Sequence, residues 1–155
     1  MGRKKIINLV LISLSLLTIV FMFLPYVSYE LLEKTNINGF KATFGYTSSD
    51  IVSGSINFKA SGSLITAFLF SIIIAVIICV ATFIKFKKRY IRPILIGVAA
   101  ILSLISMIIL FGAVKNSNPS ISSIEYKMAA GAIINAIIFM VITVGLIINE
   151  FVLGE

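Results

Sequence analysis

The segment Lys85-Phe86-Lys87-Lys88-Arg89-Tyr90-Ile91-Arg92 separates two long apolar runs of the chain. It carries five positive charges and no negative charge within eight residues. Because charges are costly to place in hydrocarbon, this segment marks a point at which the chain lies in water. Short loops rich in Lys and Arg stay on the cytoplasmic side of membranes. The segment therefore predicts a cytoplasmic loop, and the rest of the topology follows by counting outward from it.

The composition of the whole chain supports the same interpretation. Of its 155 residues, 59% are hydrophobic and only 12% are charged, against about 25% charged in soluble domains. Four stretches of 19 to 22 residues hold no charge, and each is long enough to span a hydrocarbon core of about 30 Å. They are 6–24, 64–84, 94–114 and 128–149. We predict an all-α membrane protein, an antiparallel four-helix transmembrane bundle, with 1–155 as a single integral membrane domain.

The charges also predict how the chain is oriented. Residues 25–60 and 115–127 become outer loops, and both termini lie in the cytoplasm beside loop 85–92. The positive charge is concentrated on this inner side, in Arg3 to Lys5 and in the basic loop. Anionic lipids attract such clusters, so the bilayer is the expected partner, and nucleic acid is not. The expected location is the cell membrane. The abundance of Ile and Lys indicates an AT-rich genome, typical of a low-GC Gram-positive bacterium or a mollicute.

The basic residues of the inner loop have two interpretations. Their main expected role is to set the topology. The alternative is that they bind phospholipid headgroups or an acidic partner. The residues concerned are Lys85, Lys87, Lys88, Arg89 and Arg92.

Few side chains of this chain are suited to catalysis. It has no His, and its one Cys, Cys79, lies within an apolar run. A thiol in such surroundings is inert, so we expect Cys79 to be a small core residue. The predicted spans contain no Asp, Glu, Lys or Arg, whereas ion-coupled carriers place charged groups inside the membrane. We therefore expect no enzyme activity, no cofactor and no metal site, and coupled transport is disfavoured.

The first outer loop, 25–60, has the composition of short β-strands. Aromatic and β-branched residues mix in Tyr26–Tyr29, Phe40–Phe44 and Ile56–Phe58, which predicts two or three strands. Asn38-Gly39 and Ser53-Gly54 are typical of turns between strands. A small β-textured, extracytoplasmic loop between the first two helices is therefore expected.

Six aromatic residues of this loop are candidates for partner binding, because loops on a rigid scaffold commonly carry recognition. The alternative is that they pack into the core of the loop itself or lie in the interfacial aromatic belt. The six candidates are Tyr26, Tyr29, Phe40, Phe44, Tyr46 and Phe58.

Asn135 is the most distinctive polar residue of the spans and lies near the middle of the fourth. Gly131, Ala132 and Ala136 beside it form a face of small residues. Such a face lets another helix approach closely, and the Asn amide can then bond across the contact. That second helix belongs either to this chain or to another copy. The pattern predicts a helix-packing site or an oligomer contact.

Two short motifs carry a resemblance to a known group. Leu24-Pro25-Tyr26-Val27-Ser28, followed by Asn38-Gly39-Phe40, resembles small four-helix membrane proteins of low-GC bacteria. The layout, with four spans and a first outer loop much longer than the second, resembles that of claudins. The resemblance implies a four-helix membrane fold and brings no activity with it.

These observations leave two hypotheses about function. The first is a non-enzymatic interaction protein, either an accessory subunit or an immunity-type protein, with the first outer loop as its recognition surface and another membrane or extracytoplasmic protein as partner. The alternative is a small oligomeric channel or transporter, assembled as a homo-oligomer through the fourth helix.

Overall fold

The computed structural model describes residues 2–30, 34–50, 54–117 and 125–152. Its main elements are four helices that are long and apolar enough to cross a membrane. They are α1 (Arg3–Val20, extended by the 3₁₀ turn η1, Phe21–Phe23), α3 (Gly62–Phe83), α4 (Ile91–Phe111) and α6 (Ala130–Ile147, extended by the π-helical turn η2, Ile148–Val152). The four apolar helices expected from the sequence are present, with ends that differ by up to three residues from the predicted ones.

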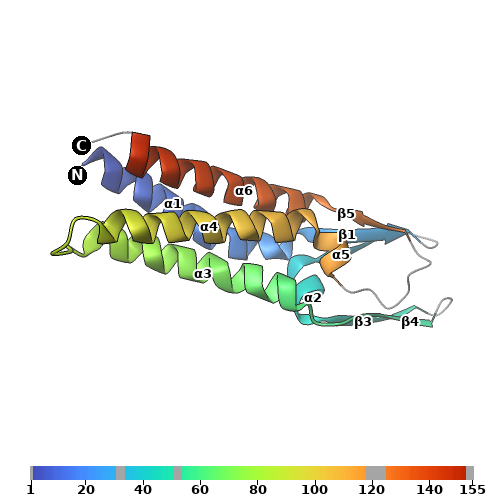
Figure 1. Cartoon of the computed structure of the whole chain (residues 1–155). Coiled ribbons are helices and arrows are strands. Elements are labelled where there is room, and N and C mark those ends of the chain that lie inside the picture. The colour runs from blue at the N-terminus through green and yellow to red at the C-terminus, as the bar shows by residue number, and fades with distance from the viewer. Residues whose placement is uncertain (1, 31–33, 51–53, 118–124, 153–155) are drawn as a thin grey trace.

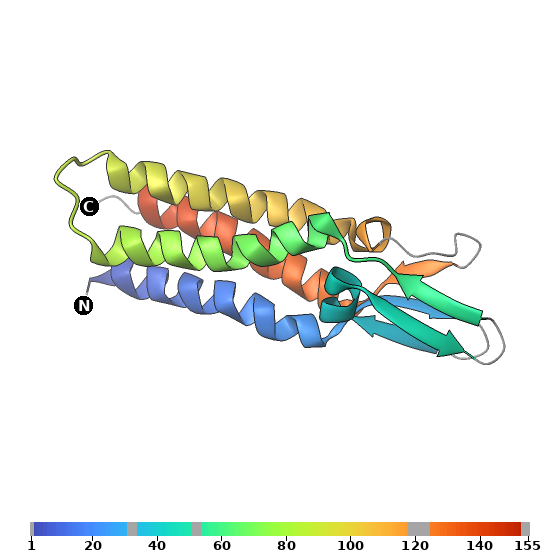
Figure 2. The same cartoon turned by 90° about the horizontal axis from the view of Figure 1, so that it is seen from below.

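The four helices lie side by side in a bundle (Figure 1). Each packs against two neighbours, in the order α1, α3, α4, α6 and back to α1. Both chain ends and the loop between α3 and α4 lie at one end of the bundle, and the described strands lie at the other (Figures 1 and 2). The basic segment 85–92 therefore shares its end of the bundle with Arg3, Lys4 and Lys5.

Polar and apolar side chains are arranged oppositely to those of a soluble bundle. On α4, Ser103 and Ser106 are fully buried, whereas Ile101 and Ile108 are 59% and 60% exposed. The other long helices also bury small and polar residues, beside some large apolar ones such as Ile78, and expose many large aliphatic residues. Extensive exposed apolar surface marks contact with a membrane or a partner, and small residues let helices approach closely in lipid. The bundle thus has the surface expected of one surrounded by hydrocarbon.

The bundle end opposite the chain termini carries a small folded unit, here called the β module (residues 25–30, 34–50, 54–58 and 126–128). Its elements are β1 (Pro25–Glu30), β2 (Lys34–Asn38), α2 (Gly39–Phe44), β3 (Tyr46–Asp50), β4 (Gly54–Phe58) and β5 (Tyr126–Met128). β1 is the central strand of a three-stranded sheet, antiparallel to both β2 and β5. β3 and β4 form a separate antiparallel hairpin. The short helix α5 (Ala113–Asn116) follows α4 beside this unit.

The strand predicted at Phe40–Phe44 is wrong, because these residues form the helix α2. The cause is Asn38, whose side-chain Oδ1 accepts a hydrogen bond of 2.9 Å from the N–H of Lys41. Asn in that position caps a helix N-terminus, so Asn38-Gly39 begins a helix where a hairpin turn was predicted. In the same way, Ser61 Oγ accepts from the N–H of Leu64 at 3.3 Å and caps α3.

The segments 25–60 and 115–127 contribute strands to one sheet, which the sequence did not predict. Val27 of β1 pairs with Met128 of β5, and Tyr29 pairs with Tyr126. The segment 115–127 was interpreted as a turn-rich loop only, and its strand is three residues long, too short to show a periodic pattern. Ser53 of the predicted Ser53-Gly54 turn lies outside the described residues.

Three aromatic rings hold the sheet and the hairpin together. The ring centroids of Tyr29 and Phe58 lie 6.4 Å apart, and Tyr126 lies 5.8 Å from each of them. Aromatic pairs at such distances add to the stabilisation that comes from burial. Because the three residues come from β1, β4 and β5, they join the segments 25–60 and 115–127 into one folded unit.

Candidate functional site

Buried polar side chains form a group where the β module meets the bundle, here called the junction cluster (Ser15, Thr18, Tyr26, Thr43, Ser71 and Asn135). Asn135 Nδ2 donates to the backbone oxygen of Thr18 at 3.0 Å and also to the hydroxyl of Tyr26. Ser15 Oγ donates to the backbone oxygen of Ser71 at 2.7 Å. The cluster therefore links α6 to both α1 and β1, and α1 to α3.

Tyr26 is the residue of β1 whose side chain bonds to the helix bundle, through Asn135. It was considered a candidate for an exposed contact surface, but only 2% of it is exposed. Burial raises the pKa of Tyr26 to about 12, and the hydrogen bond from Asn135 opposes that shift more weakly. The hydroxyl consequently keeps its proton at neutral pH. Since it accepts from Asn135, its own proton is free to be donated elsewhere.

Because residue 131 is Gly, the start of α6 can pack closely against the segment that connects α1 to β1. A Cβ atom at Gly131 would lie 2.6 Å from the backbone oxygen of Pro25 and 2.7 Å from Leu24 Cβ. Ala132 and Ala136 are both fully buried, and Asn135 is 1% exposed. All four residues of the face predicted around Asn135 are buried, so this face packs inside the chain and is not placed where a second copy would touch it.

A small cavity lies inside the junction cluster. Thr18, Tyr26, Thr43, Ser71 and Asn135 contribute polar side chains to its wall, and Phe139 is among its apolar residues. The side-chain oxygens of two of these residues, Thr43 Oγ1 and Asn135 Oδ1, are buried and have no hydrogen-bond partner among the described residues. Thr43 was not singled out from the sequence, because a Thr in a predicted exposed strand carries no signal of burial.

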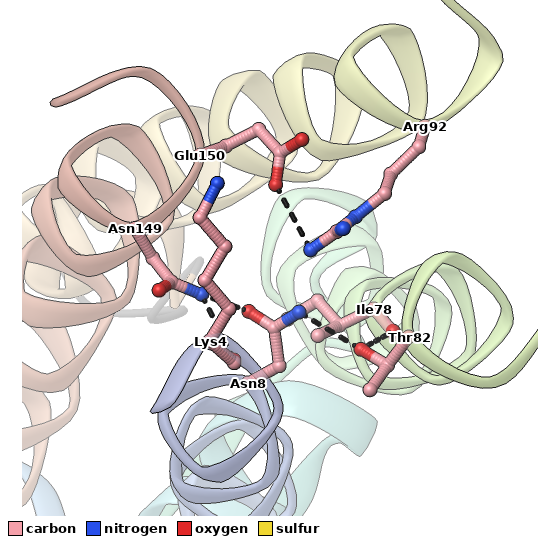
Figure 3. Close-up of polar contacts among 7 residues, drawn as sticks. All are labelled: Lys4, Asn8, Ile78, Thr82, Arg92, Asn149 and Glu150. Carbon is pink, nitrogen blue, oxygen red and sulfur yellow. Dashed lines mark hydrogen bonds and ion pairs between the residues drawn. The ribbon is translucent and has the colours of Figure 1, made fainter. Parts of the chain in front are cut away.

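A second polar group, the end cluster, lies near the chain termini (Figure 3). Asn8 Nδ2 donates to Thr82 Oγ1 at 2.9 Å, and Asn149 Nδ2 donates to Asn8 Oδ1 at 2.6 Å. Asn149 also donates to the backbone oxygen of Lys4 at 3.1 Å. These bonds join α1, α3 and η2. An Asn within an apolar helix commonly bonds to a neighbouring helix, so Asn8 and Asn149 could have been predicted from the sequence as helix-contact residues.

Arg92 belongs to this end of the bundle and forms an ion pair (Figure 3). Its guanidinium nitrogen lies 3.2 Å from a carboxylate oxygen of Glu150, whose side chain is 9% exposed. Arg92 was predicted to set topology or to contact lipid headgroups, and the structure adds a contact with η2 that the sequence did not predict. Lys85, Lys87 and Lys88 remain exposed, as does Arg89.

The six aromatic candidates fall into two groups. Tyr26, Tyr29 and Phe58 are buried, which agrees with the alternative that these residues pack into a core and not with a role as a contact surface. Phe40 and Tyr46 are half-buried, and Phe44 is 49% exposed. The sequence pattern did not predict which of these aromatic residues are buried, because β1 is buried on both faces and shows no alternation of buried and exposed residues.

Phe44 belongs to a row of rings at the border between the β module and the helices. Phe40 lies 4.8 Å from Phe23 and 6.3 Å from Phe44 between ring centroids, and Phe44 lies 5.7 Å from Phe68. Phe23 is 69% exposed. The row therefore forms a continuous, partly exposed apolar strip across η1, α2 and α3.

Within the β module, the hairpin β3–β4 extends away from the bundle, in the same direction as β1 (Figures 1 and 2). Its strands pair from Tyr46 with Phe58 at the root to Asp50 with Gly54 at the far end. Apart from the rings at the root, it makes few contacts with other described elements. Among the described strands, none pairs with either outer edge of the hairpin.

Two further observations concern chemistry. Cys79 is exposed on α3, so the expectation of a core residue is wrong. Within residues 2–30, 34–50, 54–117 and 125–152, no group of three or more Cys, Asp or Glu side chains is placed to hold a metal ion.

Comparisons with protein-family models, curated proteins and solved structures find no match to this chain.

Proposed function

We propose that this chain is a cell-membrane protein of four transmembrane helices that acts without catalysis, by binding another protein through the β module. In this proposal the module faces the outside, and both termini lie in the cytoplasm. The orientation is supported by Arg3 to Lys5 and the basic loop 85–92, which lie at the bundle end opposite the strands (Figure 1), because Lys- and Arg-rich loops stay in the cytoplasm.

The observation that carries the proposal is the projecting β3–β4 hairpin. An unpaired strand edge is a template for a further strand, and adding a strand to an open edge is a recurring way of binding an extended peptide. A two-stranded hairpin has marginal stability by itself, and this one is anchored at its root by Phe58 against Tyr29 and Tyr126. The rest of the molecule supplies a rigid base: the bundle, the sheet and the junction cluster.

The proposed recognition surface differs from the one suggested by the aromatic composition. Tyr26, Tyr29 and Phe58 are buried and act as support. The hairpin edges and the exposed ring of Phe44 remain available for contact. An accessory subunit of a membrane complex and an immunity-type protein both require such a surface. The alternative of an oligomeric channel relied on Asn135 as a contact between copies, and its burial within the chain gives that alternative no support.

The test is purification from native membranes in mild detergent, with crosslinking and mass spectrometry. One variant exchanges residues 48–55 for a Gly-Ser linker of equal length and retains Tyr46 and Phe58 at the root. A second variant, Phe44→Ser, changes α2 and leaves the hairpin intact. We expect the unaltered chain to recover one partner in a fixed ratio and the linker variant to lose it, although it still inserts into the membrane.

Two results would contradict the proposal. Recovery of the partner by the linker variant at the original ratio would show that the hairpin is not the contact. Recovery of the chain alone, as a discrete oligomer, would favour the channel. If only Phe44→Ser loses the partner, recognition lies on α2 and the hairpin assignment is wrong.

A further inference from the structure

The cavity of the junction cluster has the size and the chemistry of a site for one water molecule. Its volume, measured as the space open to the centre of a water molecule, is ≈ 10 Å³. A cavity needs about 10–15 Å³ by this measure to hold one water. Larger ligands are therefore excluded by volume.

The wall of the cavity supplies polar groups that have hydrogen-bonding capacity left over. Asn135 Oδ1 accepts no hydrogen bond, and Thr43 Oγ1 has no partner, although Thr43 is fully buried and Asn135 is 1% exposed. Tyr26 accepts a bond from Asn135 Nδ2, which leaves its hydroxyl proton uncommitted. A buried polar group without a partner is destabilising, and buried waters make about three hydrogen bonds to such groups.

We propose that this cavity binds one structural water molecule, which donates to Asn135 Oδ1 and bonds to the hydroxyls of Thr43 and Tyr26. The three residues belong to α6, α2 and β1, so the water joins the β module to the bundle at a point where no direct side-chain bond from Thr43 reaches the helices. Wholly apolar cavities stay dry, whereas a cavity with two to four polar partners can hold a water; in this mostly apolar wall, Thr43, Tyr26 and Asn135 supply such partners. The inference concerns how the module is attached, and it stands whether or not the module recognises a partner.

The direct test is a structure of the full chain in lipid at a resolution that shows ordered water. We expect one solvent peak within hydrogen-bonding distance of Thr43 Oγ1 and Asn135 Oδ1. The matched variants are Thr43→Val, which keeps the shape and removes the hydroxyl, and Thr43→Ser, which keeps the hydroxyl. The peak should persist in Thr43→Ser and be weakened or lost in Thr43→Val. An empty cavity, a direct bond between Thr43 and Asn135, or density larger than one water would overturn the proposal.

Thermal unfolding of the same variants gives a second test that needs no density. If Thr43 Oγ1 is unpaired, replacing it by a methyl group removes a desolvation cost, and Thr43→Val should raise the Tm. If the hydroxyl holds a water, Thr43→Val removes a bonded group and should lower the Tm. A fall in Tm for Thr43→Val that exceeds the change for Thr43→Ser supports the water site, and a rise contradicts it.

Discussion

The contact between Gly131 and the segment Leu24–Pro25 makes the sharpest stability prediction. In Gly131→Ala, the added Cβ would lie 2.6 Å from the backbone oxygen of Pro25, 2.7 Å from Leu24 Cβ and 3.0 Å from the backbone carbon of Leu24. Two of these three atoms are backbone atoms, which cannot rotate away as the end of a side chain can. Either α6 or the start of β1 must therefore move.

The size of the effect follows from two opposing contributions. Forcing an extra methyl group into a packed site costs about 1–3 kcal/mol, and the rigid backbone neighbours favour the upper end. Replacing Gly by Ala within a helix returns about 1 kcal/mol through helix propensity. The net loss is therefore about 2 kcal/mol for Gly131→Ala, which corresponds to a Tm lower by about 4–8 °C for a chain of this size.

Gly97 provides a matched control on α4. A Cβ atom there would meet nothing within 4 Å, so Gly97→Ala has only the favourable propensity term of about 1 kcal/mol. The assay is far-UV circular dichroism during heating in detergent, with the two variants and the parent chain in one buffer. We expect the Tm to fall for Gly131→Ala and to stay the same or rise for Gly97→Ala. A Gly131→Ala chain as stable as the Gly97→Ala chain would refute the close approach of α6 to β1.

Three further predictions concern buried polar groups. Because the pKa of Tyr26 is raised from 10.0 to about 12, the unfolded chain releases this proton first. The stability due to Tyr26 is therefore complete below pH 10 and declines by about 1.4 kcal/mol per pH unit above it; Tyr26→Phe should flatten that decline in thermal unfolding between pH 9 and 11.5. Asn8→Ala should lower the Tm by the equivalent of about 1–3 kcal/mol, because it removes the two buried hydrogen bonds that Asn8 makes with Thr82 and Asn149; an unchanged Tm would argue against the end cluster. Arg92→Met and Glu150→Gln should be less destabilising together than the sum of the single changes, and strict additivity in a double-mutant cycle would contradict their pairing.

The arrangement of the helices could be predicted because it depends on length and charge. Four uncharged runs predict four apolar helices, and the structure contains them. The segments between them were harder to predict, because local patterns compete with capping and long-range pairing. Phe40–Phe44 has the residues of a strand, yet the Asn38 cap and packing against the bundle make it helical.

The junction cluster could be predicted only in part. Asn135 was identified as an unusual residue in an apolar span, and its bonds to Thr18 and Tyr26 explain its presence. Tyr26 and Thr43 could not be assigned to the same place, because their burial depends on how the loop folds back onto the bundle. The pairing of β1 with β5 spans about a hundred residues of sequence, and nothing in either segment alone indicates it.

The most direct test of the central claim, a β module held outside the cell by four spans, is cysteine labelling. In a Cys79→Ala background, Thr47→Cys places a thiol on the hairpin and Lys87→Cys places one in the basic loop; both positions are exposed. A membrane-impermeant maleimide is added to intact cells and, separately, to permeabilised cells. The account predicts that the Thr47 position is labelled in intact cells and that the Lys87 position is labelled only after permeabilisation. Labelling of the Lys87 position in intact cells, with or without the Thr47 position, would contradict it.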